Sequence, residues 1–176
     1  MAFVFQDAHL LPWRSLLDNT ALPLELIGVA RDERHARASA LLSELGLDGA
    51  FARYPNELSG GMRMRASLAR ALATEPALLL LDEPFAALDE LTRGRLDDLL
   101  RALWTRRRMT VLFVTHSIAE ATYLAERAIV LSKRPARVLL DHPIALPAER
   151  SSELRGSPEL AREAHVLFRV LEGDDA

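Results

Sequence analysis

The 176-residue sequence contains no cysteine, a single lysine and no apolar run approaching the ~20 residues that a membrane-spanning helix requires. Without cysteine there are no disulfides, no thiolate metal sites and no cysteine nucleophile, and this composition fits a reducing cytoplasm. The net charge is −3 and no block of like charge exceeds residues 106–108, so the basic footprint of a nucleic-acid-binding protein is missing. The sequence also starts without the basic segment of a secretory signal. We therefore expect a chain that is soluble or peripheral on a membrane.

Length and composition indicate the scale of the fold. Hydrophobic residues make up 49% of the chain and charged residues 27%, which is typical of globular rather than disordered proteins. A chain of this length suffices for one domain with a substantial core, whereas two lobes would each be small.

Residues 77–89 read ALLLLDEPFAALD and predict a strand that ends in two adjacent carboxylates. Five apolar residues in a row favour a short strand buried on both faces of a parallel sheet. Asp82 and Glu83 then lie at its carboxyl end, where open α/β sheets bind ligands, and Pro84 stops the strand. Such a pair can divide phosphoryl-transfer chemistry, with one carboxylate holding Mg²⁺ and the other polarising an attacking water. The plainer interpretation is a core strand that ends in a solvated acidic turn.

Two further strand patterns are followed by polar residues that suit a phosphate or metal site. Residues 2–5 (AFVF) precede Gln6, whose neutral amide can meet a metal ion or a water, although an ordinary loop residue is the simpler interpretation. Residues 110–115 (TVLFVT) predict a second buried strand with His116 at its carboxyl end. Because the carboxyl ends of parallel strands share an edge, His116 can reach the same crevice as Asp82 and Glu83. A structural hydrogen-bonding histidine is the alternative.

The stretch from residue 10 to residue 74 contains no strand pattern, and we interpret it as a helical lobe inserted between sheet strands. Its first two helices are expected over residues 16–27 and 33–45. The second of these has Asp32 as its predicted N-cap and Gly46 as its stop.

The second half of the chain alternates helix and strand patterns. Asp89 is the expected cap of one helix, and Ser117 with Glu120 forms a capping box for another. The elements expected here are helices over 90–104, 118–127 and 159–171 and strands over 128–132 and 137–140.

Residues 58–62 read LSGGM and start a further helix. Ser59 is a favourable N-cap, and Gly60 and Gly61 remove side chains from the helix start, where backbone N–H groups and the positive dipole end point outward. Such an end binds phosphate, although an ordinary capped helix with a flexible entry is the alternative. The helical period places Met62, Ala66, Ala69 and Ala73 on one face, and Arg63, Ser67, Arg70 and Thr74 on another.

Taken together and in order, these motifs resemble the ATPase subunit of an ABC transporter. The matching motifs, in the family's order and approximate spacing, are Gln6, LSGGM at 58–62, LLLLDEP at 78–84, ALD at 87–89 and TH at 115–116. FQDAHLLPW at residues 5–13, Met62 where glutamine is usual, and DEPFAALD are similar to one import subfamily. That subfamily resembles the ATPases of nitrate, sulfonate, taurine, bicarbonate and thiamine-precursor uptake.

The resemblance implies ATP and Mg²⁺ as cofactors and a role for each residue near them. Gln6 would be the Q-loop glutamine that touches Mg²⁺ or water and couples to the permease. Asp82 would be the magnesium ligand and Glu83 the general base. His116 would be the switch histidine that orients the γ-phosphate and the attacking water.

The remaining motifs imply a second ATPase subunit. Ser59, Gly60 and Gly61 would be the signature that caps the γ-phosphate of ATP held on that subunit, and Asp89 would be the D-loop aspartate. The implied partners are this second subunit, in a homodimer, a transmembrane permease and, indirectly, a solute-binding protein, but no nucleic acid. The implied localisation is cytoplasmic and peripheral on the inner face of the plasma (inner) membrane.

The family's phosphate-binding loop, GxxxxGK[ST], is absent from this sequence. The one lysine, Lys133, lies in SKRP without a glycine loop, and the aromatic that stacks on adenine is also missing. The expected fold is therefore an α/β, partial P-loop NTPase (ABC ATPase) core with parallel strands and an inserted helical lobe, its first strands and P-loop absent. We expect the isolated chain to bind ATP weakly and not to hydrolyse it.

The expected organisation is one truncated ABC ATPase domain over residues 1–176. Within it, a helical lobe with the signature would occupy 10–74, catalytic-core strands and helices 75–145, and a C-terminal tail with an amphipathic helix 146–176. In related folds the P-loop strand lies between the strands matching 110–115 and 128–132. Removing it leaves unpaired strand edges, at about 1–3 kcal/mol for each buried group, so we expect the isolated chain to be unstable or to recruit a partner.

Three functions follow from these motifs. The first is the carboxyl-terminal part of an import ATPase whose Leu10, Leu11 and Trp13 lie exposed and receive a short permease helix. The second is a pseudo-enzyme or regulatory fragment that offers only the signature face to an intact ATPase partner. The third, an ABC protein of DNA repair or translation, is disfavoured by the import-type motifs and the acidic net charge.

Overall fold

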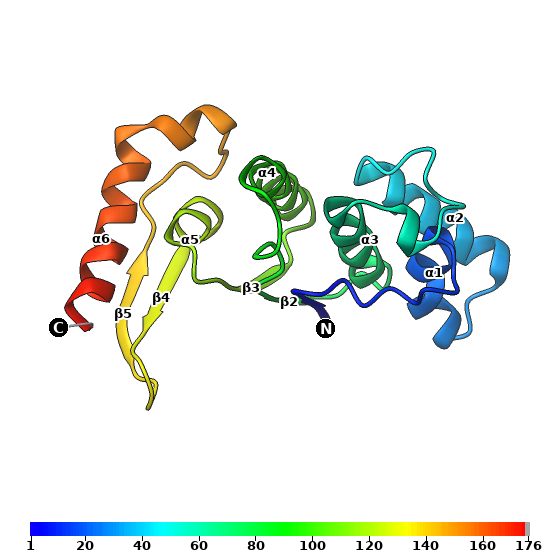
Figure 1. Cartoon of the computed structure of the whole chain (residues 1–176), viewed down its shortest axis with the longest axis horizontal. Helices are drawn as coiled ribbons and strands as arrows, with labels where there is room; N and C mark the ends of the chain where they lie inside the picture. Colours follow the sequence, from blue (N-terminus) through cyan, green and yellow to red (C-terminus); the bar gives the residue numbers. More distant parts are fainter. Residues whose placement is uncertain (175–176) are drawn as a thin grey trace. The chain divides into compact units, whose positions relative to one another are not determined.

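The computed structural model describes residues 1–174 and divides into two compact units (Figure 1). The first unit comprises Met1–Leu96 and Arg108–Val114, and the second comprises Asp97–Arg107 and the described residues from Thr115 onward. Helix α4 (Glu90–Arg107) therefore contributes its first turns to one unit and its later turns to the other.

Within residues 1–174, the sheet of the first unit consists of three parallel strands, in the order β1 (Ala2–Phe5), β2 (Leu78–Asp82) and β3 (Thr110–Val114). In its register Phe5 pairs with Asp82, and Asp82 pairs with Val114. The carboxyl ends of the strands therefore lie at one edge. The α/β fold with a parallel sheet that the sequence predicts is confirmed.

Only one face of this sheet is buried. Val4, Leu79 and Leu81 have at most 1% of their surface exposed, whereas on the opposite face Phe3 and Leu112 are 49% and 56% exposed. The expectation that the strands are buried on both faces is wrong for this chain, because side chains alternate between a covered face and an open one. An apolar run allows burial on both faces, but burial itself depends on what packs there.

The chain between β1 and β2 forms the expected helical lobe (Figure 1). The lobe contains α1 (Leu16–Leu26), α2 (Arg31–Glu44), the 3-10 helix η1 (Pro55–Glu57) and α3 (Gly60–Leu72). Its core is rich in leucine, and the buried leucines are Leu16, Leu24, Leu41, Leu42, Leu45, Leu47, Leu58, Leu68 and Leu72.

The start of α2 differs from the sequence prediction. The helix begins at Arg31 with Ala30 in the N-cap position, so Asp32 lies in the first turn instead of capping it. There its negative charge still favours the positive end of the helix dipole. The end of the helix is as expected, because Gly46 adopts a φ of +66°, a left-handed conformation that glycine tolerates.

The second unit combines a β-hairpin with helices. β4 (Arg127–Leu131) pairs antiparallel with β5 (Val138–Pro143), and α5 (Ile118–Leu124), η2 (Ser152–Gly156) and α6 (Pro158–Asp174) complete the unit. One buried apolar cluster of this unit consists of Ala128, Val130, Ile144 and Leu167. α5 stops at Leu124, earlier than expected, since β4 already starts at Arg127. Across residues 1–174, every helix is too short or too polar to cross a lipid bilayer.

A buried polar cluster connects α4, α5 and η2 within the second unit. Asp97 is 2% exposed, and Arg155 donates to it at 3.4 Å and to Asp98 at 2.8 Å. The Arg155 guanidinium lies 3.7 Å from the ring centroid of Tyr123, whose hydroxyl donates to Asp98 at 2.7 Å. Burial, followed by the negative charge of Glu120, raises the pKa of Asp97 to about 7.

Candidate functional site

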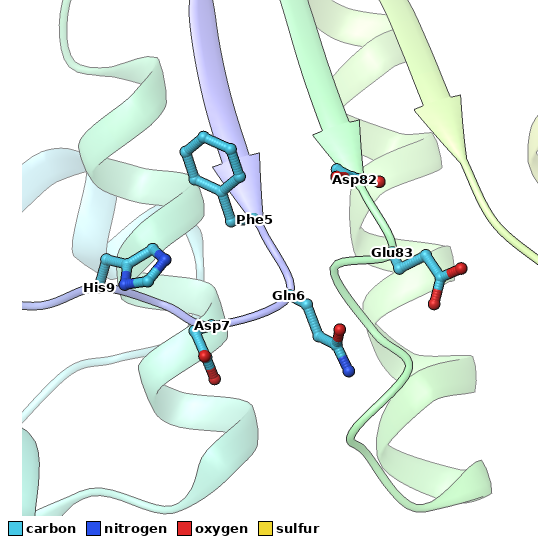
Figure 2. A pocket seen from close by; sticks show the side chains of 6 residues that line it. All are labelled: Phe5, Gln6, Asp7, His9, Asp82 and Glu83. Carbon is cyan, nitrogen blue, oxygen red and sulfur yellow. The ribbon is translucent and has the colours of Figure 1, made fainter.

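The carboxyl ends of β1 and β2 border an open hollow in the first unit. Because Phe5 and Asp82 are paired, the residues that follow them, Gln6 and Glu83, leave the sheet beside each other. The hollow has a volume of about 450 Å³, and its lining residues are Phe5, Gln6, Asp7, His9, Asp82 and Glu83. Figure 2 shows the Gln6 side chain extending between the two loops, while the Glu83 carboxylate points away from Gln6. The structure thus brings Gln6, Asp82 and Glu83 to one place.

The backbone at Glu83 is bent out of the strand. Its φ is +45°, in the left-handed region that a non-glycine residue enters at a cost of roughly 1–2 kcal/mol. The Glu83 N–H donates to the Val114 carbonyl at 2.9 Å, and the Ala86 N–H donates to the Glu83 carbonyl at 3.2 Å. These hydrogen bonds fix both the N–H and the carbonyl of Glu83. The position of Glu83 is therefore imposed by its neighbours and not by its own conformational preference.

The loop between β2 and α4 is fixed by two polar side chains. Arg93 donates from Nη2 to the Leu88 carbonyl at 3.0 Å and from Nε to the Phe85 carbonyl at 3.4 Å. Asp89 accepts the Thr92 N–H at 2.9 Å and so caps α4, as the sequence predicts. The hydrogen bond from the Thr92 side chain is the main cause that lowers the pKa of Asp89.

The glycine pair at the start of α3 makes room for the start of α4. Ser59 is exposed, and its Oγ accepts a backbone N–H of the first turn at 3.2 Å, which is the cap expected from the sequence. A Cβ atom on Gly61 would lie 2.7 Å from Thr92 Cγ2, and one on Gly60 would lie 3.3 Å from Leu88 Cδ2. The sequence alone suggested room for phosphate as the reason for these glycines. The structure adds close packing between two helices.

His116 belongs to the second unit, where its exposed side chain precedes the cap of α5. Ser117 Oγ accepts the Glu120 N–H at 3.3 Å, but the Ser117 N–H donates to Thr115 Oγ1 at 2.9 Å and not to the Glu120 carboxylate. Thr115 in turn donates its hydroxyl to that carboxylate. Only half of the expected capping box is therefore formed: Ser117 caps the helix, but Thr115 takes the place of the Glu120 carboxylate as the acceptor of the Ser117 N–H. The role of His116 beside ATP stays a prediction.

Comparison with known proteins identifies the family of this chain. The profile of the ABC transporter family matches residues 1–86. The taurine import ATP-binding protein TauB of Escherichia coli (strain K12) is 43% identical over 179 residues, and the match covers 98% of this chain and 70% of that protein. The chain belongs to the ABC transporter family.

Two further relatives carry the same name and have a larger unmatched part. TauB of Rhizobium johnstonii is 53% identical over 136 residues, which cover 77% of this chain and 52% of that protein. TauB of Sinorhizobium fredii is 49% identical over 166 residues, which cover 92% of this chain and 62% of that protein. The chain thus spans about half to two thirds of the length of these relatives.

The residues of the hollow fit the Mg²⁺ and phosphate expected of an ABC transporter protein. Mg²⁺ takes oxygen ligands, usually one or two carboxylates together with waters and phosphate oxygens. Asp82 is exposed and offers a carboxylate, and Gln6 offers an amide oxygen from the neighbouring strand end. Ser59 stands at the exposed amino end of α3, a helix of 13 residues, and such an end suits a phosphate group.

The side chains that hold the loop after Gln6 in this ABC transporter protein were not predicted from the sequence. Arg70 of α3 donates to two carbonyls of that loop, and Asn19 of α1 is completely buried against it. The helical period grouped Arg70 with polar residues such as Ser67, yet Ser67 is 2% exposed and Arg70 contacts the loop. One signal was present in the sequence, since an asparagine inside a helix is disfavoured unless its side chain binds backbone.

Proposed function

We propose that this chain is the carboxyl-terminal part of the ATP-binding subunit of an importer for taurine or another small sulfonate. The observation that carries the proposal is that Gln6, Asp82 and Glu83 line one hollow at the carboxyl ends of two paired strands. The relatives, which are taurine import ATP-binding proteins, support the class of solute. Nitrate, bicarbonate and thiamine precursors remain the other solutes of the import subfamily.

In this proposal the chain's own residues bind the metal and handle the proton of the attacking water. Asp82 and Gln6 hold Mg²⁺, which neutralises charge on the phosphate oxygens when it is bound. Glu83 accepts the proton of the water, a role that suits a carboxylate whose backbone is fixed at the edge of the hollow. His116 orients the γ-phosphate and the water.

The same proposal gives the chain three partners. Ser59, Gly60 and Gly61, with Asp89, face ATP held on a second copy of the subunit. The chain lies in the cytoplasm on the inner face of the plasma (inner) membrane, where the loop at Trp13 receives a short cytoplasmic helix of a transmembrane permease. A solute-binding protein acts through the permease. Support for the permease contact comes from Trp13, which is 70% exposed. Leu10 and Leu11, however, are half-buried, so the exposed apolar surface is smaller than the sequence suggested.

The test joins this chain, in frame, to the amino-terminal segment of a family member that carries the GxxxxGK[ST] loop. This chimera is expressed in Escherichia coli (strain K12) cells that lack their own TauB. Labelled taurine uptake is measured in the cells, and phosphate release is measured on the purified chimera. We expect both activities in the chimera and their loss, by about 10²-fold or more, in its Glu83→Gln variant, because the substitution removes the base and keeps the metal ligands.

Separate outcomes contradict separate parts of the proposal. Equal phosphate release by the chimera and its Glu83→Gln variant would assign the base to another residue, with His116 examined first. Phosphate release without taurine uptake, combined with uptake of nitrate in a matching strain, would overturn the solute class. A well-folded chimera that binds Mg-ATP but never hydrolyses it would favour the pseudo-enzyme function.

A further inference from the structure

Arg70 connects the last turn of α3 to the loop after Gln6. Its Nη2 donates to the Ala8 carbonyl at 2.7 Å and its Nη1 donates to the His9 carbonyl at 2.7 Å, across more than 60 residues of sequence. Burial lowers the pKa of Arg70, which indicates that the guanidinium is partly removed from water. A guanidinium in such surroundings is stabilised by its hydrogen-bond acceptors, and here both acceptors belong to one short loop.

The loop needs such support because its backbone is strained. His9 has a φ of +45°, in the left-handed region that histidine enters more often than most residues but still at a cost. Its imidazole lies edge-on to Phe5, with ring centroids 5.7 Å apart. The chain therefore curls back between Phe5 and His9, and Gln6 lies within the curl. The two carbonyls bound by Arg70 are at the end of this curl.

Asn19 holds the continuation of the same loop. Its Oδ1 accepts the Leu11 N–H at 2.7 Å, and its Nδ2 donates to the carbonyls of Leu11 at 3.1 Å and of Arg14 at 3.0 Å. The segment from Ala8 to Arg14 is therefore held by buried or half-buried polar groups of two different helices. Gln6 is followed by a fixed segment, not by a freely moving one.

α3 also carries the signature motif at its other end. Gly60 and Gly61 pack against Leu88 and Thr92 at the start of α4, and Arg70 lies ten positions along the helix from Gly60, about 15 Å at 1.5 Å per residue. One helix thus contacts the loop after Glu83 through its first turn and the loop after Gln6 through its last turn.

We infer that Arg70 is a positioning residue for Gln6. Its hydrogen bonds join the Ala8 and His9 carbonyls to α3 and so hold Gln6 at the hollow. The inference deepens the proposed function and rests on it for the role of Gln6. Arg70 itself does not line the hollow. A bidentate guanidinium is required because a lysine ammonium presents a single point of charge to the two carbonyls.

The chain offers a matched control in Arg65, which lies on the same helix. Arg65 also donates to two backbone carbonyls, those of Leu45 at 3.2 Å and Gly46 at 3.1 Å, at the end of α2. Arg65→Met and Arg70→Met therefore remove the same chemistry from one helix, but only the second change releases the Gln6 loop.

The first measurement is amide hydrogen exchange on the full 176-residue chain. In Arg70→Met we expect exchange in peptides covering residues 6–14 to rise by about tenfold, with α3 unchanged, because release of the loop is a local opening. In Arg65→Met we expect faster exchange only near residues 44–47. Arg70→Lys should lie between wild type and Arg70→Met, and it provides the comparison if Arg70→Met lowers the folded fraction. Exchange over residues 6–14 that is the same in wild type, Arg70→Met and Arg70→Lys would overturn the inference.

The second measurement uses the chimera described above. We expect Arg70→Met to lower kcat by about 10–100-fold with less than a twofold change in KM for ATP, since a displaced Gln6 affects the reacting complex more than nucleotide affinity. Arg70→Lys should recover part of kcat, and Arg65→Met should leave it unchanged. A loss that matches only the loss of folded protein would show a structural role and overturn the inference. If the chimera itself neither hydrolyses ATP nor supports uptake, the proposed function fails, and the exchange data still decide whether Arg70 holds the loop.

Discussion

The contact between Gly61 and Thr92 makes the clearest quantitative prediction. Gly61 is buried in the first turn of α3, and an added Cβ atom would lie 2.7 Å from Thr92 Cγ2. Ordinary contact starts at 3.4 Å, so Gly61→Ala forces the two helices or the threonine side chain apart by several tenths of an ångström. At Gly60 the Cβ would meet Leu88 Cδ2 at 3.3 Å, and this atom is the end of a flexible side chain.

Two opposing effects determine the size of the change. Overpacking a well-packed site costs typically about 1–3 kcal/mol. Alanine has a higher helix propensity than glycine, by up to about 1 kcal/mol in a helix interior and less in a first turn. We therefore expect Gly61→Ala to lower the free energy of unfolding by about 1–2 kcal/mol. Gly60→Ala should be close to neutral because the leucine can move.

The assay is urea unfolding of the chain, followed by tryptophan fluorescence, in a double-mutant cycle with Thr92→Ser. This substitution removes Cγ2 but keeps the hydroxyl that hydrogen-bonds Asp89. We expect the double variant to be about as stable as Thr92→Ser alone, with a coupling free energy of about 1–2 kcal/mol, equal to the cost of Gly61→Ala. Gly61→Ala with wild-type stability, or a double variant that shows no recovery, would refute the packing role of the glycine.

Two other predictions concern the buried acid of the second unit and the exposed tryptophan of the first. The folded chain keeps a proton on Asp97 up to about pH 7 while the unfolded chain releases it near 3.8, so this residue makes stability fall as pH rises through that window, by at most about 1.4 kcal/mol per pH unit. Asp97→Asn should remove this slope and be more stable than wild type at pH 8. Urea unfolding at pH 6 and pH 8 measures the two free energies of unfolding, and a difference between them that is the same in wild type and variant would contradict this prediction. Trp13→Ala should change the free energy of unfolding by less than about 0.5 kcal/mol, since the side chain is 70% exposed, yet lower taurine uptake per ATP hydrolysed in the chimera. A large loss of stability would instead make Trp13 a packing residue.

The sequence was most reliable where the physical cause is local. Ser59, Asp89 and Ser117 each cap a helix as predicted, because an N-cap depends on the next three residues only. It was less reliable where several candidates compete within one turn. Asp32 is not the N-cap of α2, because the helix already starts at Arg31 and Ala30 occupies the N-cap position.

Burial was predicted less well than the elements themselves. The apolar runs of β2 and β3 are strands, as expected, but Phe3 and Leu112 show that one face of their sheet is open. An apolar sequence allows a strand to be buried on both faces, but each face is buried only where another element packs against it. The same reason explains Ser67, which the helical period grouped with polar residues and which is buried.

The sequence by itself determined the α/β class, the order of the motifs and the arrival of Gln6 and of Asp82 with Glu83 at strand ends. These follow from short periodic patterns and from the rule that parallel strands share their carboxyl edge. Only the tertiary structure decided that Phe5 pairs with Asp82, that Gly61 packs against Thr92 and that Arg70 holds the loop after Gln6. Each of these contacts joins residues about 30 to 80 positions apart in the chain. Periodicity and capping act over a few residues, so contacts of that separation are determined by packing and hydrogen bonding in the folded chain.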